Sequence, residues 1–204
     1  MDYIDITIPL SERTPVFPGD PEVRFESQMR DGYRITSICL SSHSGTHLDA
    51  PFHYMEGGCG VDEIPLGSIN GEAVVIDLSS AGDLIDRDDI EGKAEGVNIL
   101  ILKTGFSLKS PDMGSYVSLS SGCAEYLVDC GVTCVVTDAP SIEAFDGDGT
   151  VHRTLLGNSV YIIEMAGLSG VLPGRYRLNA MPMRLEGCDG SPVRAILYPV
   201  QKEI

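Results

Sequence analysis

Short apolar runs, each bounded by turn residues, dominate the chain and predict β-strands. The segments with this pattern are 2–10, 23–30, 33–43, 71–78, 97–103, 132–137, 159–165, 175–185 and 192–198. The second and third of these flank Asp31-Gly32, a dipeptide that favours a tight hairpin. The last two flank residues 187–190 and are also expected to pair as a hairpin. The runs at 71–78, 97–103 and 132–137 are continuously apolar, as in strands buried on both faces.

Helical patterns are few. Residues 120–130 are the strongest helix candidate, because serines can cap the start, apolar positions share one face, and Gly131 follows the end. With the apolar run at 132–137, this helix predicts a strand–helix–strand unit. Shorter helical turns are predicted at 85–92 and 152–158. The pattern as a whole indicates a strand-rich α/β fold.

The length and composition are those of one globular domain covering residues 1–204, without repeats or linkers. No apolar run is as long as a membrane span, and the acidic start is unlike a secretory signal, so we expect a cytoplasmic protein. The formal net charge of −16 argues against nucleic-acid and anionic-membrane partners. The six cysteines contain no CxxC pair and are expected to be free thiols. Cys59, between glycines, could lie near a candidate site, because it comes just after a histidine cluster.

That cluster is the segment 43–53, which contains three of the four histidines in the chain. His43, His47, Asp49 and His53 all occupy odd positions, so an extended backbone would place the four side chains on one face. A helix would also bring His43 close to His47, but Gly45 and Pro51 disfavour it, and we expect a strand that runs into a loop and presents the four groups to one point in space. Imidazoles with a carboxylate are typical ligands of zinc, manganese or iron. The alternative is that these are ordinary surface or hydrogen-bonded histidines.

His152 and Glu164 are further ligand candidates. Glu164 interrupts an apolar run, where a carboxylate is costly unless it is paired, metal-bound or on a strand edge that faces water. With the cluster, the candidates number six, which exceeds the three protein ligands of a typical catalytic zinc. Two metals that share a bridging carboxylate fit this number better, and Asp49 lies at the centre of the cluster.

The segment 43–53 resembles the HxGTHxDxPxH signature of the cyclase-like metal-dependent hydrolase family. This family includes kynurenine formamidases (arylformamidases), isatin hydrolases and some polyketide cyclases. Weaker similarities extend along most of the chain, at 17–20 (FPGD), 103–106 (KTGF), Asp138 with 141–142, and 189–195 (DGSPVRA). The spacing from His152 to Glu164 also fits the family.

The resemblance implies a role for each candidate. His43, His47 and Asp49 would hold one metal, Asp49, His152 and Glu164 the second, and His53 would be the general acid/base. The expected cofactor is a divalent metal, two zinc ions per chain, with manganese or iron as alternatives. The implied fold is a swivelling β/β/α domain with a mixed, strongly curved sheet, assembled as a homodimer or homotetramer.

The implied activity is hydrolysis of an aryl formamide such as N-formylkynurenine to an aryl amine and formate, a step of tryptophan catabolism. Phe17 and Phe106 are expected to wall the substrate pocket, at places where the family often carries larger aromatics; the chain has no tryptophan. Three alternatives stay open: hydrolysis of a cyclic amide or lactone, a metal-dependent cyclisation or dehydration, and non-enzymatic binding of a small molecule.

Overall fold

The computed structural model describes residues 3–106 and 111–200, and this part of the chain has the expected strand-rich α/β structure with few helices. The strands are β1 (Ile4–Asp5), β2 (Arg24–Arg30), β3 (Tyr33–Cys39), β4 (His47–Asp49), β5 (Gly71–Asp77), β6 (Leu84–Ile85), β7 (Ile99–Lys103), β8 (Ser118–Leu119), β9 (Cys134–Thr137), β10 (Tyr161–Glu164), β11 (Gly174–Pro182) and β12 (Gly190–Pro199). The helices are α1 (Arg87–Ile90), α2 (Ser121–Asp129) and α3 (Thr150–Gly157), with 3₁₀ turns η1 (Pro51–His53), η2 (Val61–Glu63) and η3 (Leu66–Ser68).

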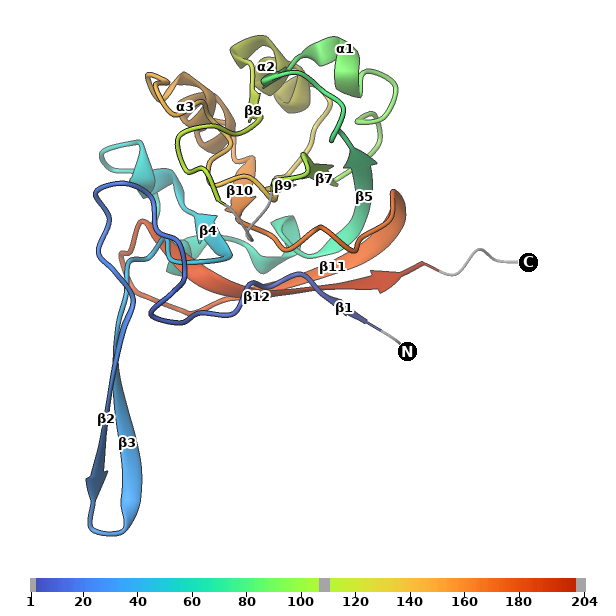
Figure 1. Cartoon of the computed structure of the whole chain (residues 1–204). Coiled ribbons are helices and arrows are strands. Elements are labelled where there is room, and N and C mark those ends of the chain that lie inside the picture. Colours follow the sequence, from blue (N-terminus) through green and yellow to red (C-terminus); the bar gives the residue numbers. More distant parts are fainter. Residues whose placement is uncertain (1–2, 107–110, 201–204) are drawn as a thin grey trace.

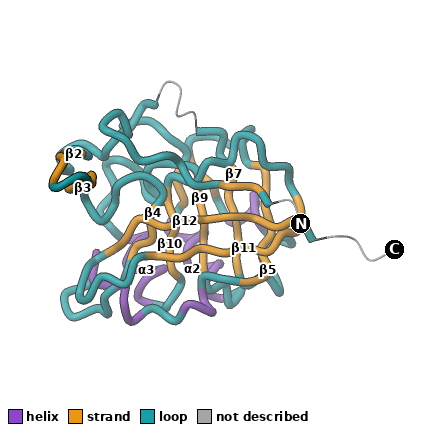
Figure 2. Tube along the Cα trace, turned by 90° about the horizontal axis from the view of Figure 1, so that it is seen from below, coloured by secondary structure: helices purple, strands orange, loops and turns teal. Residues whose placement is uncertain are grey.

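Seven of the described strands close into a mixed barrel. The order is β12–β11–β5–β7–β9–β10–β4, and β4 pairs again with β12, while β1 extends the sheet beside β12. β5, β7, β9 and β10 are parallel to one another, whereas the remaining pairings of this sheet are antiparallel. The helices lie together on one side, and the long β11–β12 ribbon lies on the other (Figure 1). Figure 2 shows the barrel strands side by side from below.

The parallel strands are buried on both faces, as their continuous apolar sequences predict. In β7, Ile99 and Ile101 belong to the core inside the barrel, and the alternating Leu100 and Leu102 pack against the helix side. The same division holds in β5 and β9. A strand that is covered by helices on one face and by the opposite barrel wall on the other is therefore apolar on both faces along most of its length.

The predicted hairpin at Asp31-Gly32 is confirmed. Both residues have positive φ, 44° and 87°, as a type I′ turn requires, and β2 and β3 pair in full register around them. However, β3 ends at Cys39 and does not run on to residue 43. The hairpin extends away from the barrel (Figure 1).

The first strand is much shorter than the predicted 2–10. The strand pairing with β12 comprises Ile4 and Asp5, and the Ile6 amide still donates to the Ala195 carbonyl oxygen of β12 at 3.0 Å before the backbone turns to other partners. At Ile8 the backbone has left the sheet, and the Ile8 amide donates a hydrogen bond to Thr46 Oγ1 at 2.9 Å. Ile6 and Ile8 are nevertheless buried, as the apolar alternation predicts. Residue 2 lies outside the described residues.

The helix expected at 120–130 is confirmed as α2. Ser120 caps it by accepting the Cys123 amide at 3.1 Å, and Gly131 follows its end with a φ of 73°. The turns expected at 85–92 and 152–158 correspond to α1 and α3, and the pairing of β11 with β12 confirms the last hairpin. All six cysteines are unpaired in the structure. In the described residues, none of the helices has the length and apolar character needed to cross a membrane.

Candidate metal centre

The candidate site lies on the outer face of the barrel, where β4 pairs with β10. His47 is paired in register with Glu164, and Asp49 with Ile162. Between them Leu48 points into the barrel core, so strand alternation sends His47, Asp49 and Glu164 to the opposite face. All three are buried, and Glu164 therefore does not lie on a strand edge that faces water.

The histidines of segment 43–53 converge, but not through the extended backbone that their odd numbering predicts. Only residues 47–49 are a strand. Gly45 has a φ of 66°, which breaks the extension before His47, and Pro51 starts the turn η1 that carries His53. The expected convergence of these groups is therefore present, but it depends on a turn at each end of a three-residue strand, and the prediction of one continuous extended face was wrong.

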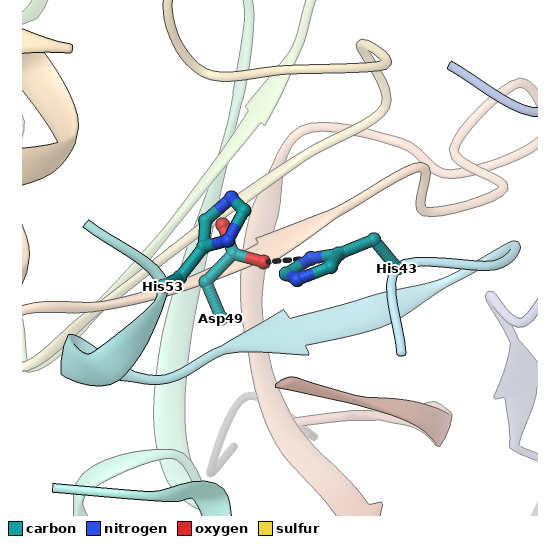
Figure 3. A group of neighbouring side chains, drawn as sticks. All are labelled: His43, Asp49 and His53. Atoms are coloured by element: carbon teal, nitrogen blue, oxygen red, sulfur yellow. Dashed lines mark hydrogen bonds and ion pairs between the residues drawn. The ribbon is translucent and has the colours of Figure 1, made fainter. Parts of the chain in front are cut away.

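His43, Asp49 and His53 form the first group of potential ligands (Figure 3). Each offers one ligand atom, and these atoms lie within 4.8 Å of one another. His43 Nδ1 is 2.9 Å from Asp49 Oδ1, and the rings of His43 and His53 are 4.0 Å apart between centroids. Asp189 immediately precedes β12, and its Oδ2 atom is 3.1 Å from His43 Nε2 and 3.6 Å from His53 Nδ1.

His47, Asp49 and Glu164 form the second group, again within 4.8 Å. His47 Nε2 is 3.3 Å from Asp49 Oδ1 and 3.4 Å from Glu164 Oε2. His152, on α3, adds an imidazole whose Nε2 is 3.4 Å from Glu164 Oε1 and 3.8 Å from Asp49 Oδ2. The structure therefore brings all six candidates together, and Asp49 is common to both groups.

The residues present fit a metal centre. Asp49 Oδ2 is fully buried and has no hydrogen-bond partner among the described residues, which is costly for a carboxylate oxygen unless a cation binds it. His47 Nδ1 contacts the Gly45 carbonyl oxygen at 2.8 Å, which fixes the tautomer and leaves Nε2 free for a metal. Imidazole nitrogens and carboxylate oxygens are a donor set suited to divalent metals of the zinc, manganese and iron kind.

The protonation equilibria also reflect a site built for cations. Burial alone would lower the pKa of each inner histidine, but the adjacent carboxylates outweigh it. They raise the pKa of His43 to about 9, through Asp189 and Asp49, and that of His47 to about 10, through Asp49 and Glu164. The pKa of His152 is raised to about 9 in the same way, through Glu143 and Glu164. His53 differs, because its burial prevails and lowers its pKa below 6.5.

A pocket of about 240 Å³ opens over the candidate metal ligands. Its lining comprises Phe17, Asp20, His43, His47, His53, Tyr54, Met113, Pro140, Ser141, His152, Glu164 and Met165. Phe17 is thus part of the pocket wall, and its ring is 5.6 Å from that of Phe145. Phe106, which was expected in the pocket wall, is not in this lining; it borders a separate depression together with Tyr116. Cys59 is not in the lining either.

Several site residues were not singled out from the sequence. Tyr54 stacks on His152, with ring centroids 4.1 Å apart and planes 9° from parallel, and meets His53 edge-on at 4.7 Å. Glu143 Oε2 is 2.8 Å from His152 Nδ1. Tyr54 has no signal beyond its position after His53. Glu143 could have been noticed as a carboxylate in a mostly apolar stretch, and Asp189 lies in the DGSPVRA segment.

Comparisons with known proteins agree with this geometry. The family model named Cyclase, described as "Putative cyclase", matches residues 4–144. The kynurenine formamidase of Salinibacter ruber is 34% identical over 207 residues, and the alignment covers 97% of either chain. A solved structure of a potential metal-dependent hydrolase with cyclase activity has a TM-score of 0.86 at 33% identity, covering 96% of both chains. An isatin hydrolase bound to the product analogue thioisatinate has the same fold, with a TM-score of 0.82 at 21% identity over 96% of this chain and 91% of its own. The chain therefore belongs to the Cyclase family, with kynurenine formamidases among its full-length relatives.

Proposed function

We propose that this chain is a metal-dependent amidohydrolase that hydrolyses an aryl formamide, such as N-formylkynurenine, to the aryl amine and formate. The observation that carries the proposal is the buried Asp49 carboxylate, which has one oxygen without a hydrogen-bond partner, at the centre of four imidazoles and Glu164. Full-length similarity to kynurenine formamidases supports the reaction class, hydrolysis of a C–N bond outside peptides.

In this proposal His43, His47 and Asp49 hold one divalent metal, and Asp49, His152 and Glu164 hold the second. Zinc is the expected ion, and manganese or iron would suit the same donors. This assignment of the ligands to two metals rests on family resemblance. The short distances from Asp49 to residues of both ligand sets support its bridging role. Bound metals would supply Lewis acidity toward the amide carbonyl and a water activated at neutral pH.

His53 is the proposed general acid/base. It is the most exposed of the four histidines, at 29%, and it lines the pocket. Its lowered pKa keeps it neutral at pH 7, so it can accept a proton from the attacking water and return it to the leaving amine. Tyr54, against its edge, restricts the orientation of the ring.

The pocket wall suits an aromatic substrate. Phe17 and Tyr54 give it two aromatic surfaces, and Met113 adds an adaptable apolar one.

We further propose that residues 1–204 are one domain of the swivelling β/β/α type and that the protein is a homo-oligomer, a dimer or a tetramer. The resemblance supports both statements, and the closed barrel is consistent with the first.

The test measures metal content and hydrolysis on the same preparation. Purified protein is analysed for metals and assayed with N-formylkynurenine, a simple aryl formamide and isatin, with and without a chelator. We expect about two metals per chain and chelator-sensitive release of formate. Turnover of isatin alone would replace the formamidase proposal with hydrolysis of cyclic amides, and bound metal without turnover of any of the three would reject it.

A further inference from the structure

The turn at residues 17–20 contributes two side chains to the wall of the pocket. The Asp20 amide donates to the Phe17 carbonyl oxygen at 3.0 Å, and Gly19 has a φ of 103°. Proline at the second position and a glycine with positive φ at the third are typical of a type II turn. This turn holds its two ends, Phe17 and Asp20, close together, and both of them line the pocket.

Asp20 is a half-buried carboxylate without a counter-charge in the described part of the chain. It takes part in none of the ion pairs between described residues, and it belongs to neither group of potential metal ligands. The other carboxylate of the pocket lining, Glu164, contacts His47 and His152. Asp20 therefore keeps its attraction for a cation that enters the pocket, and partial burial strengthens that attraction.

The rest of the pocket does not compensate this charge. Its lining, within residues 3–106 and 111–200, contains neither lysine nor arginine. Two divalent metals would bring four positive charges, and the carboxylates among and beside the proposed ligands already number four, namely Asp49, Glu143, Glu164 and Asp189. The negative charge of Asp20 comes in addition to that balance, so the pocket favours a ligand that carries a positive charge.

We propose that Asp20 is a specificity-determining residue that binds an ammonium group on the side chain of the aryl formamide substrate. This inference rests on the proposed function. The substrate ring packs on Phe17 while the ammonium group pairs with Asp20, so that a single turn recognises two features of one ligand. The formamide group is then left to the metal centre and His53, which line the same pocket.

The selection works by attraction and by repulsion. An ammonium group gains a charged hydrogen bond to Asp20, whereas a carboxylate at the same place on the substrate meets a like charge. The formal net charge of −16 on the whole chain acts in the same direction at longer range. A neutral aryl formamide binds through its ring alone, so its affinity does not depend on Asp20.

The test uses three aryl formamides that share the ring and a short side chain, which ends in an ammonium, a neutral amide or a carboxylate. The metal-loaded wild type is compared with Asp20→Asn, which keeps the shape of the side chain and removes its charge, and with Asp20→Lys, which reverses the charge. Glu22→Gln is the matched control, because the Glu22 side chain is close in sequence, 76% exposed and outside the pocket lining.

In wild type, kcat/KM should decrease in the order ammonium, neutral amide, carboxylate. Asp20→Asn should lower kcat/KM for the ammonium substrate by ~3–30-fold, mainly through KM, because a charged hydrogen bond in a partly solvated pocket is lost. The neutral substrate should change little, and Asp20→Lys should prefer the carboxylate. Metal content should equal that of wild type in every variant, because Asp20 belongs to neither ligand group.

Three results would overturn the proposal. The first is an Asp20→Asn variant that keeps the wild-type order of substrates. The second is an equal loss of kcat/KM for all three formamides, because a charge-selective contact affects the charged substrates alone. The third is a Glu22→Gln variant that loses the preference as Asp20→Asn does, since that change removes the same charge from outside the pocket.

Calorimetric binding of the corresponding aryl amines separates this proposal from the proposed function. These ligands have no formyl group, so their affinity does not depend on turnover, and Asp20→Asn should weaken the one with the ammonium side chain by ~3–30-fold. If wild type shows this binding but hydrolyses no formamide, the proposed function fails and the ammonium site stands. If wild type hydrolyses all three formamides equally well, the ammonium site fails and the proposed function stands.

Discussion

His53 provides the sharpest test of how the site works, because the structure places it beside potential metal ligands. It belongs to the group with His43 and Asp49, and its ring is 4.0 Å from that of His43. If it is the acid/base, His53→Ala should leave the metal content at the wild-type value. If it is a ligand, the same change should reduce both metal content and activity.

The expected magnitude follows from the surroundings of the ring. General acid–base catalysis contributes ~10²–10⁴-fold, about 3–5 kcal/mol of activation free energy at 1.36 kcal/mol per tenfold. At 29% exposure, the ring fills the pocket wall and not the barrel core, so its removal should cost little stability. Its lowered pKa predicts that kcat/KM falls as the pH decreases through a value below 6.5, and this limb should be absent in the variant.

The assay is steady-state formate release across pH 5 to 9 together with elemental analysis of the same sample. His43→Ala is the comparison variant, because His43 hydrogen-bonds Asp49 directly and is a proposed ligand; it should lose metal. Retained metal with a ~10²–10⁴-fold loss of kcat supports the acid/base role. Joint loss of metal and activity in His53→Ala would make His53 a ligand and refute the reasoning.

Further predictions concern the bridge, the pocket, the core and pH. Asp49→Asn should abolish activity and bind less than one metal per chain by elemental analysis, because both proposed sites share this carboxylate; retention of two metals would contradict the bridge. Phe17→Ala should raise KM for an aryl formamide ~2–10-fold with little change in kcat, because the substrate would lose about 0.5–1.5 kcal/mol of aromatic contact. An unchanged KM would show that Phe17 does not contact the substrate. Leu48→Ala should lower the free energy of unfolding by ~2–5 kcal/mol in denaturant titrations, and a loss below about 1 kcal/mol would contradict its place in the core. The metal-free protein should lose stability as pH rises from 6.5 through 9 to 10, because the folded state holds protons on His47 and its neighbours that the unfolded state has released; a flat thermal-melting profile over this range would contradict it.

The sequence was sufficient for features that depend on near neighbours. Asp31-Gly32 specifies its turn because few residue pairs accept positive φ at both positions, and the hairpin was located correctly. The burial of β7 on both faces follows from its uninterrupted apolar run, because one face of the strand packs against the barrel core and the other against the helices. Three histidines and an aspartate within eleven residues also sufficed to mark the candidate site, because imidazoles with a carboxylate are typical ligands of divalent metals.

The arrangement of the site was decided by tertiary structure. The pairing of β4 with β12 places Asp189 beside His43, although 146 positions separate them, and no local periodicity encodes such a contact. The packing of α3 against the barrel sets the Nε2 atom of His152 opposite Glu164, and the loop before it supplies Glu143. Even the short segment 43–53 was predicted with the right residues and the wrong backbone, because its turns at Gly45 and Pro51 bring together side chains that an extended chain would only have aligned. Residue types and their spacing determine which chemistry the chain can carry, whereas distances between ligand atoms depend on contacts that form only when the barrel closes.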